Sequence, residues 1–248
     1  YHLLSYDVID STNEEAKRLA LAGGQHGAVI WSEAQTAGKG RDGRQWISDA
    51  GNLFCSLLLQ PCAPQVNLPQ LSFVTSLALY QALEGVIETE HELALKWPND
   101  LLLDDKKLGG ILLETIPDEN SDARWVIVGI GINVEHYPSE ARYPATSLKA
   151  AGVEIISAKI VLSRFLNCFE PLYDEWLERG FEKIRSQWLE RAAFMGQELT
   201  LNLPEAKVCG TFTGIDAVGR LMLTNIEGQH TVYDAGDVSL EMSDAVSD

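Results

Sequence analysis

The chain has 248 residues, of which 46% are hydrophobic and 22% are charged, a composition typical of a globular protein with a large core. Nineteen Lys and Arg stand against 36 Asp and Glu, and the resulting net charge of −17 argues against nonspecific binding to nucleic acid or to an anionic membrane. The sequence contains no signal peptide and no apolar run near the ~20 residues of a membrane helix, so no membrane association is expected.

The first half of the chain alternates strand-like and helix-like segments. Residues 2–10 predict a strand, and Ser11 and Glu14 then form an S-x-x-E capping box for a helix that Gly23 and Gly24 end. Predicted strands at 27–34 and 52–60 flank a glycine-rich loop, and a long buried helix is predicted at 68–88.

The second half begins with a strand at 93–97, a hairpin over 100–116 that turns at Asp104 to Lys107, and a strand at 124–134. Helices are predicted from Ser157 to Glu178 and from Phe181 to Phe194, and short strands with glycine turns follow. The fold class is therefore α+β, a mixed-sheet domain with packed helices (residues 1–194) followed by a small β-barrel (residues 195–248).

The cysteines Cys55, Cys62, Cys168 and Cys209 show no C-x-x-C spacing, and the five histidines show no H-E-x-x-H pattern. A histidine or thiolate metal site is therefore not indicated. Since Cys55, Cys168 and Cys209 lie among apolar or strand-like neighbours, we expect reduced, buried thiols and a cytoplasmic location.

The loop "GKGRDGRQW" (residues 38–46) matches the G-x-G-x-x-G spacing of a dinucleotide site. Such a site needs a helix that begins within the glycines, whereas this loop runs on toward another strand, so the dinucleotide prediction fails. A Walker A loop fails as well, because no Gly-Lys-Ser/Thr follows. Two interpretations stay open at this stage: a solvated basic loop, or a loop that closes over a phosphate or carboxylate.

"LALKWPNDLLL" places Lys96 inside an apolar strand, where an unpaired ammonium costs several kcal/mol. Its partner is either Asp100 or the anion of a ligand. Glycines inside two later strands, Gly109 with Gly110 and Gly129 with Gly131, indicate bulges or the close approach of a ligand or another backbone.

Four motifs then stand in order: "DSTNEEA", "EAQTAGKGRDGRQW", "KWPNDLLLDDKKLGGILLE" and "VGIGINV". With them, nearly the whole chain resembles the biotin protein ligases, and its C-terminal strands resemble their small SH3-like domain. The resemblance implies a two-step reaction with ATP and Mg²⁺: biotin is activated as biotinoyl-5'-AMP and is then transferred to a lysine of a biotin carboxyl carrier protein.

The resemblance also implies roles for individual residues. Lys96 and Arg41 are the expected catalytic residues. The expected biotin-binding residues are Ser11, Thr12, Asn13, Gln35, Lys39, Gly40, Arg41 and Lys96. The expected adenylate or ATP contacts are Gly38, Gly43, Arg44, Trp46, Asn99, Lys107, Gly110 and Asn133, and Asp100 is the expected metal ligand.

Two loop positions depart from the family pattern. The family often has arginine at the position of Lys39, and a further basic residue at the position of Asp42. Lysine keeps the charge but loses the bidentate fork of arginine, and Asp42 lowers the charge of the loop. These departures put in doubt how tightly the loop holds the adenylate.

Two alternatives stay open. One is a lipoate or octanoyl ligase or transferase with a similar catalytic fold, although an apolar acyl tail does not need the polar residues from Ser11 to Asn13 and Gln35. The other is a noncatalytic biotin sensor, which the presence of Lys96, Arg41 and the loop glycines argues against. Some family members carry an N-terminal helix-turn-helix domain, but this chain enters the catalytic domain at once, so we expect no repressor activity. The oligomeric state is open, with a homodimer as one arrangement.

Overall fold

The computed structural model describes residues 1–61, 65–117, 124–140, 143–153 and 157–240. Its main element is a seven-stranded mixed sheet in the order β1-β2-β3-β7-β6-β5-β4. The strands are β1 (His2–Ile9), β2 (Ala28–Gln35), β3 (Leu53–Leu59), β4 (Leu93–Lys96), β5 (Asp100–Leu103), β6 (Lys106–Pro117) and β7 (Arg124–Ile132). The pairing of β1 with β2 is parallel, and all the others are antiparallel.

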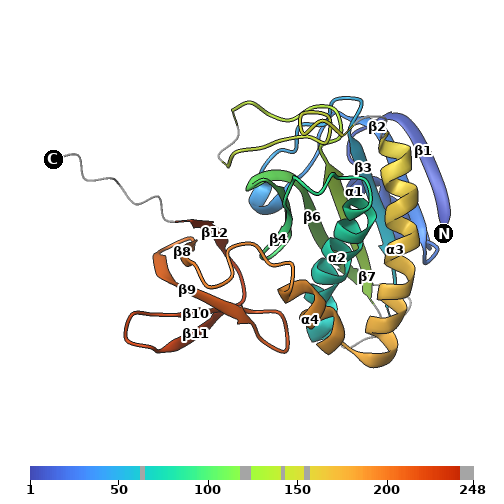
Figure 1. Ribbon diagram of the computed structural model, residues 1–248. Helices are drawn as coiled ribbons and strands as arrows, with labels where there is room; N and C mark the ends of the chain where they lie inside the picture. Colours follow the sequence, from blue (N-terminus) through green and yellow to red (C-terminus); the bar gives the residue numbers. More distant parts are fainter. Residues whose placement is uncertain (62–64, 118–123, 141–142, 154–156, 241–248) are drawn as a thin grey trace.

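Helices cover both faces of this sheet. α2 (Leu71–Glu84) and α3 (Ala158–Arg179) run side by side over one face (Figure 1). Along β3, Cys55 and Leu57 belong to the large core on that face, whereas Leu58 belongs to a smaller core beneath α1 (Thr12–Leu21). This alternation along one strand follows from the two-residue period of β structure, and it explains why β3 is apolar throughout.

The predicted helices are confirmed with shifts at their ends. α2 begins at Leu71 because a 3₁₀ segment, η2 (Gln65–Gln70), contains Pro69 and precedes it. α3 begins after Ser157, whose hydroxyl oxygen accepts a hydrogen bond from the backbone N–H of Ile160.

The predicted end of the next helix at Phe194 is wrong. α4 (Glu182–Leu189) ends earlier, because the chain after it pairs with β4. The Leu95 N–H donates to the Arg191 carbonyl, and the Ala193 N–H donates to the Leu95 carbonyl, each at 2.8 Å. Backbone pairing with a distant strand replaces helical hydrogen bonds here, and the sequence carries no local sign of it.

The C-terminal strands form a separate antiparallel sheet in the order β11-β10-β9-β8-β12. Its strands are β8 (Glu198–Asn202), β9 (Lys207–Ile215), β10 (Leu221–Thr224), β11 (His230–Tyr233) and β12 (Asp237–Leu240). A turn at Gly236 (φ +149°) separates β11 from β12. The boundary near residue 195 and closure into a barrel stay predictions.

This second sheet packs against the first unit near β4 (Figure 1). The Trp97 indole N–H donates to the Gly219 carbonyl at 3.0 Å, and a Cβ at Gly219 would lie 2.6 Å from the ring of Phe73. Leu199, Leu201 and Phe212 belong to the same core cluster as α2. The two sheets therefore share one continuous apolar contact.

The cysteine prediction is correct only in part. Cys55 is buried, but Cys168 is half-buried and Cys209 is exposed, because the Cys209 side chain is on the outer face of β9. Burial raises the pKa of the Cys55 thiol far above its usual range. Cys62 lies outside the described residues. No helix in the described part of the chain is both long and apolar enough to cross a membrane.

Candidate active site

A cavity of about 590 Å³ opens between the first sheet, the loop 38–46 and the second sheet. This volume is within the usual range for small-molecule sites. The structure brings fifteen of the predicted site residues to its wall: Ser11, Thr12, Asn13, Gln35, Lys39, Gly40, Arg41, Arg44, Trp46, Lys96, Asn99, Asp100, Lys107, Gly110 and Asn133. Residues from four separate motifs of the sequence thus line one cavity.

One end of the cavity is polar and uncharged, and hydrogen bonds fix it. The Ser56 hydroxyl lies 2.8 Å from Thr12 Oγ1 and 2.6 Å from Asn13 Oδ1. Gln35 Oε1 accepts from the Thr12 N–H at 2.7 Å, and its Nε2 donates to Ser48 Oγ at 2.9 Å. Because the side chains of Thr12 and Asn13 are buried and paired, this end presents donors and acceptors in fixed positions.

The capping box predicted for Ser11 and Glu14 is wrong. Ser11 is the N-cap residue of α1 with extended backbone (φ −156°, ψ 135°), but its side chain makes no capping hydrogen bond, and its own N–H donates to Asp10 Oδ1 at 2.7 Å. The Glu14 carboxylate is bound to Lys17 and Lys39 instead. Charge-assisted bonds to ammonium groups outcompete a bond to a neutral backbone N–H.

Two glycines of β7 allow side chains from other segments to pack directly against the strand backbone, as glycines inside a strand predicted. A Cβ at Gly129 would overlap Asn13 Oδ1, and a Cβ at Gly131 would lie 2.5 Å from the Trp46 ring. The Trp46 indole nitrogen is buried without a hydrogen-bond partner among the described residues. The two glycines therefore leave room for Asn13 and Trp46 to pack against the sheet.

The other end of the cavity carries positive charge around Lys96, whose side chain is 3% exposed. Its Nζ lies 3.6 Å from Asp100 Oδ2, 3.5 Å from Asp237 Oδ1 and 4.2 Å from the centroid of the Tyr143 ring. Lys107 Nζ donates to Asp100 Oδ1 at 2.5 Å. The ion pair with Asp100 considered from the sequence is thus present, and Asp237 of β12 is a second partner that the sequence analysis missed.

A tight turn positions these groups. β4 ends at Lys96, the Trp97–Pro98 peptide is cis, and β5 begins at Asp100. The Asn99 amide donates to the Ile111 carbonyl at 2.5 Å, which fixes its side chain against β6. Lys96 and Asp100 are register partners across this turn, so their side chains emerge on the same face of the sheet.

The loop 38–46 contains only one turn of 3₁₀ helix, η1 (Arg41–Gly43), and no α-helix begins in it. This backbone confirms the rejection of the dinucleotide fingerprint. Gly43 has φ +73°, and a Cβ at Gly38 would lie 2.5 Å from the Trp46 carbonyl oxygen. Gly38 and Gly43, predicted as adenylate contacts, therefore shape the loop and lie outside the cavity lining.

The loop cations all have partners in the protein. Arg41 Nη1 donates to Asn99 Oδ1 at 3.1 Å. Arg44 donates to Asp42 Oδ2 at 2.9 Å and to Asp237 Oδ2 at 3.3 Å. Chiefly its hydrogen bond to Asp42 raises the pKa of Arg44. Lys39 and Arg44 thus form ion pairs with carboxylates, whereas Arg41 is bound to the neutral Asn99 amide.

Sequence analysis missed five residues at or beside the cavity: Glu14, Ser56, Glu114, Tyr143 and Asp237. Ser56 had a usable signal, since it is the only polar residue in the apolar strand "LFCSLLL". Burial is the main cause that raises the pKa of Tyr143 to about 12, and nearby carboxylates add to it. The phenol therefore stays neutral beside Lys96. Asp237 lies far from Lys96 in sequence, and only the folded chain reveals that they meet.

Charge at the cavity contrasts with the rest of the protein. Its lining includes six cations (Lys39, Arg41, Arg44, Lys96, Lys107 and Lys207) and three carboxylates (Asp100, Glu140 and Asp237). The whole chain has a net charge of −17. An anionic ligand is therefore repelled by most of the surface and attracted at this opening.

Comparisons with known proteins agree with this geometry. Residues 5–133 match the biotin/lipoate A/B protein ligase family, and residues 194–241 match the biotin protein ligase C terminal domain. The chain belongs to the biotin protein ligase family. The first match covers more than half of its length, and the second covers the C-terminal sheet.

Individual relatives of this family extend the likeness along the chain. The bifunctional ligase/repressor BirA of Bacillus subtilis is 36% identical over 244 residues, which are 96% of this chain and 74% of that protein. The biotin--[acetyl-CoA-carboxylase] ligase of Paracoccus denitrificans is 36% identical over 228 residues, 90% of this chain and 94% of that one. The biotin protein ligase from Aquifex aeolicus, solved in complex with biotin and ATP, superimposes with a TM-score of 0.82 at 32% identity and covers 96% of this chain and 97% of its own.

Proposed function

We propose that this chain is an ATP-dependent biotin–protein ligase, with biotin and ATP as substrates and the biotin carrier of a carboxylase as the acceptor. The supporting observation is the cavity with two unlike ends. A rigid, neutral hydrogen-bonding end at Thr12, Asn13 and Gln35 suits the ureido ring of biotin, and a cationic end at Lys96 and Arg41 suits a carboxylate next to a phosphate.

In the first step, an oxygen of the biotin carboxylate attacks the α-phosphorus of ATP. The bond from that phosphorus to the bridging oxygen breaks, and pyrophosphate leaves with the electron pair. Both reactants are anions, so cations must offset their repulsion and the charge that develops in the transition state. Lys96 is buried and fixed by the β4–β5 turn, and Arg41 is held over Asn99, so both can supply this charge without rearranging the backbone.

In the second step, the amine of a carrier lysine attacks the acyl carbon of biotinoyl-5'-AMP. An amide bond forms, AMP leaves, and the amine loses a proton. The mixed anhydride must be kept from water until then, and the loop 38–46 lies at the cavity wall where it can exclude water. Lys96 then stabilises the phosphate of the departing AMP.

Mg²⁺ neutralises charge on the phosphates of ATP when it is bound. Within the described residues, no cluster of three or more His, Cys, Asp or Glu could hold a metal ion. Mg²⁺ is commonly held by one or two carboxylates together with substrate phosphates, and Asp100 is a buried carboxylate in the cavity wall that would have to release Lys96 or Lys107 to bind it. We propose Asp100 as its protein ligand.

The polar end of the cavity favours biotin over lipoate. A dithiolane ring and its alkyl chain cannot exchange hydrogen bonds with Thr12, Asn13 and Gln35, whereas the ureido ring of biotin can. Each such bond contributes about 0.5–1.5 kcal/mol, so lipoate should bind more weakly. The match of the C-terminal sheet to the biotin protein ligase C terminal domain supports the same choice.

The remaining parts of the proposal concern assembly and location. In the described part of the chain, β6 from Leu112 to Pro117 pairs with β7 alone, and an open strand edge of this kind suits pairing with a second copy. We propose a homodimer on this basis, to be tested by sedimentation. The free thiols of Cys55 and Cys168 support a cytoplasmic location.

Pyrophosphate release from ATP, Mg²⁺ and biotin tests the proposal, with transfer to a carboxylase carrier fragment as the second measurement. Biotin should give pyrophosphate and lipoate should not. Lys96→Ala should abolish release, and Lys149→Ala, at a lysine that is 69% exposed, should not change it. Biotin binding without pyrophosphate release would favour a sensor, and activity with lipoate alone would favour the lipoate ligases.

A further inference from the structure

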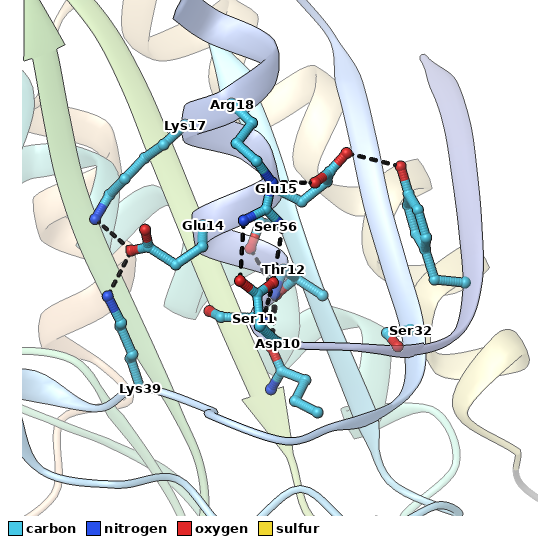
Figure 2. A network of polar contacts seen from close by, with 12 residues as sticks. Asp10, Ser11, Thr12, Glu14, Glu15, Lys17, Arg18, Ser32, Lys39 and Ser56 are labelled. Atoms are coloured by element: carbon cyan, nitrogen blue, oxygen red, sulfur yellow. Dashed lines mark hydrogen bonds and ion pairs between the residues drawn. The ribbon is translucent and has the colours of Figure 1, made fainter.

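The first two turns of α1 carry two separate ionic clusters (Figure 2). In one, which we call the edge cluster, Arg18 binds Asp10 and Glu15, and the Tyr6 hydroxyl donates to Glu15. In the other, which we call the loop cluster, one carboxylate oxygen of Glu14 accepts from Lys17 at 2.7 Å and from Lys39 at 2.5 Å. Only the loop cluster reaches the loop 38–46.

The loop cluster continues from the loop to the neutral end of the cavity. Lys17 Nζ also donates to Glu114 Oε1 at 2.7 Å, and Glu114 Oε2 accepts from the Asn13 amide at 2.7 Å. The same Asn13 accepts from Ser56. A continuous chain of hydrogen-bonded groups therefore runs from Lys39 through Glu14, Lys17 and Glu114 to Asn13.

The burial of this chain increases away from the loop. The Lys39 side chain is 44% exposed, Glu14 is 30% exposed, and Lys17 and Glu114 are each 26% exposed. Hydrogen bonds from Lys17 and then Lys39 hold the pKa of Glu14 below its usual value near 4.5, so the carboxylate is ionised at neutral pH. The negative charges of two carboxylates and the positive charges of two ammonium groups cancel, so this chain of groups carries no net charge.

Lys39 is thus differently placed from the other loop cations. Arg41 and Arg44 are directed to groups across the cavity, on the β4–β5 turn and on the second sheet. The Lys39 ammonium is bound to α1 instead. An ammonium is compact, so it can share a single carboxylate oxygen with Lys17, which the broad guanidinium fork of arginine cannot do as closely.

We propose that Glu14 is a positioning residue that anchors Lys39 on α1 and so holds the loop 38–46 beside the neutral end of the cavity. The retention of the reaction intermediate by that loop rests on the function proposed above, whereas the anchoring itself does not. In this arrangement Lys39 acts through Glu14, and its charge is not used on the ligand. Occupation of the neutral end, sensed through Asn13 and Glu114, is thereby linked to the loop.

Two measurements on Glu14→Gln separate the anchoring from the function. Without ligand, the amides of Gly40 and Trp46, which are hydrogen-bonded within the loop to Arg44 and Gly38, should exchange about fivefold faster than in the wild type. With biotin, ATP and Mg²⁺, the intermediate should be released about fivefold faster, while pyrophosphate formation stays within about twofold. Glu15→Gln, in the edge cluster of the same helix turn, should change neither, and melting curves of all variants should report an intact fold.

A double-mutant cycle with Lys39→Gln decides how Lys39 acts. If the pair is the working unit, Lys39→Gln, Glu14→Gln and the double variant should all release the intermediate at the same rate. A larger effect of Lys39→Gln that adds to that of Glu14→Gln would show that Lys39 contacts the ligand and would overturn the proposal. Unchanged exchange of the loop amides in Glu14→Gln would overturn it as well, whatever the activity. Faster exchange in a protein whose wild type releases no pyrophosphate would support the anchor and reject the ligase.

Discussion

The two ends of the cavity are built in different ways. At the neutral end, Ser56 bonds to Thr12 and Asn13, the Asn13 amide also donates to Glu114, and these side chains are paired within the protein without a ligand. At the cationic end, Lys96 is bound to carboxylates from β5 and β12, which would compete with the anions of the proposed substrates. The neutral end is therefore preorganised, whereas in the proposed reaction the cationic end would exchange internal carboxylates for substrate anions.

The largest effect is expected from removing Lys96, the buried cation of the cationic end. Lys96→Ala should reduce adenylate formation by about 100-fold or more, the usual effect of losing a group that stabilises transition-state charge. Stability should change little, because Asp100 keeps Lys107 and Asp237 keeps Arg44 as partners. Thermal unfolding beside Leu95→Ala, a fully buried neighbour whose loss should cost about 2–5 kcal/mol, checks this. Equal destabilisation by both substitutions would make Lys96 a structural residue.

A substitution at the neutral end should separate the two substrates. Gly129→Ala places a Cβ against Asn13 Oδ1 and should weaken biotin binding by about tenfold or more, because that end cannot move without losing paired hydrogen bonds. ATP binding should change much less. Calorimetric titration with each ligand measures this. Gly85→Ala, where a Cβ would meet only Arg164 at 3.7 Å, is the control.

In contrast to these substitutions, removing an internal carboxylate at the cationic end should strengthen substrate binding. Asp237→Asn leaves Lys96 and Arg44 with one fewer competing anion, so the KM for ATP should fall by about two- to fivefold. Steady-state kinetics at two salt concentrations measures the change. A higher KM would mean that Asp237 is part of the nucleotide site and would remove the contrast between the ends.

The smallest expected effect is a pH dependence of stability from Glu14. Because its pKa is lowered in the folded protein, the ion pairs of Glu14 stabilise the fold above about pH 4.5, and this contribution is lost as pH falls toward the folded pKa. The melting temperatures of wild type and Glu14→Gln should therefore differ slightly at pH 7 and converge below pH 4.5. A difference that persists in acid would point to a packing effect instead.

The sequence predicted the fold class, the order of nearly all elements and fifteen of the residues that line the cavity. Hydrophobic periodicity gives α3 almost to the residue, and glycines inside β6 and β7 indicated the places of close approach. It could not give the end of α4, which depends on pairing with β4. It also could not give the partners of the cations, since Glu14 with Lys39 and Asp237 with Lys96 meet only through tertiary structure.

β12 has a consequence for how affinity can be tuned. Among the described strands it pairs with β8 alone, at the end of its sheet, and strands at such edges open at a lower free energy than the core. Its first residue is Asp237, so local opening of β12 withdraws a counter-ion from Lys96. Anion binding and the fraying of one edge strand are therefore thermodynamically linked, and substitutions on β8 or β12 far from the ligand can change substrate affinity without touching it.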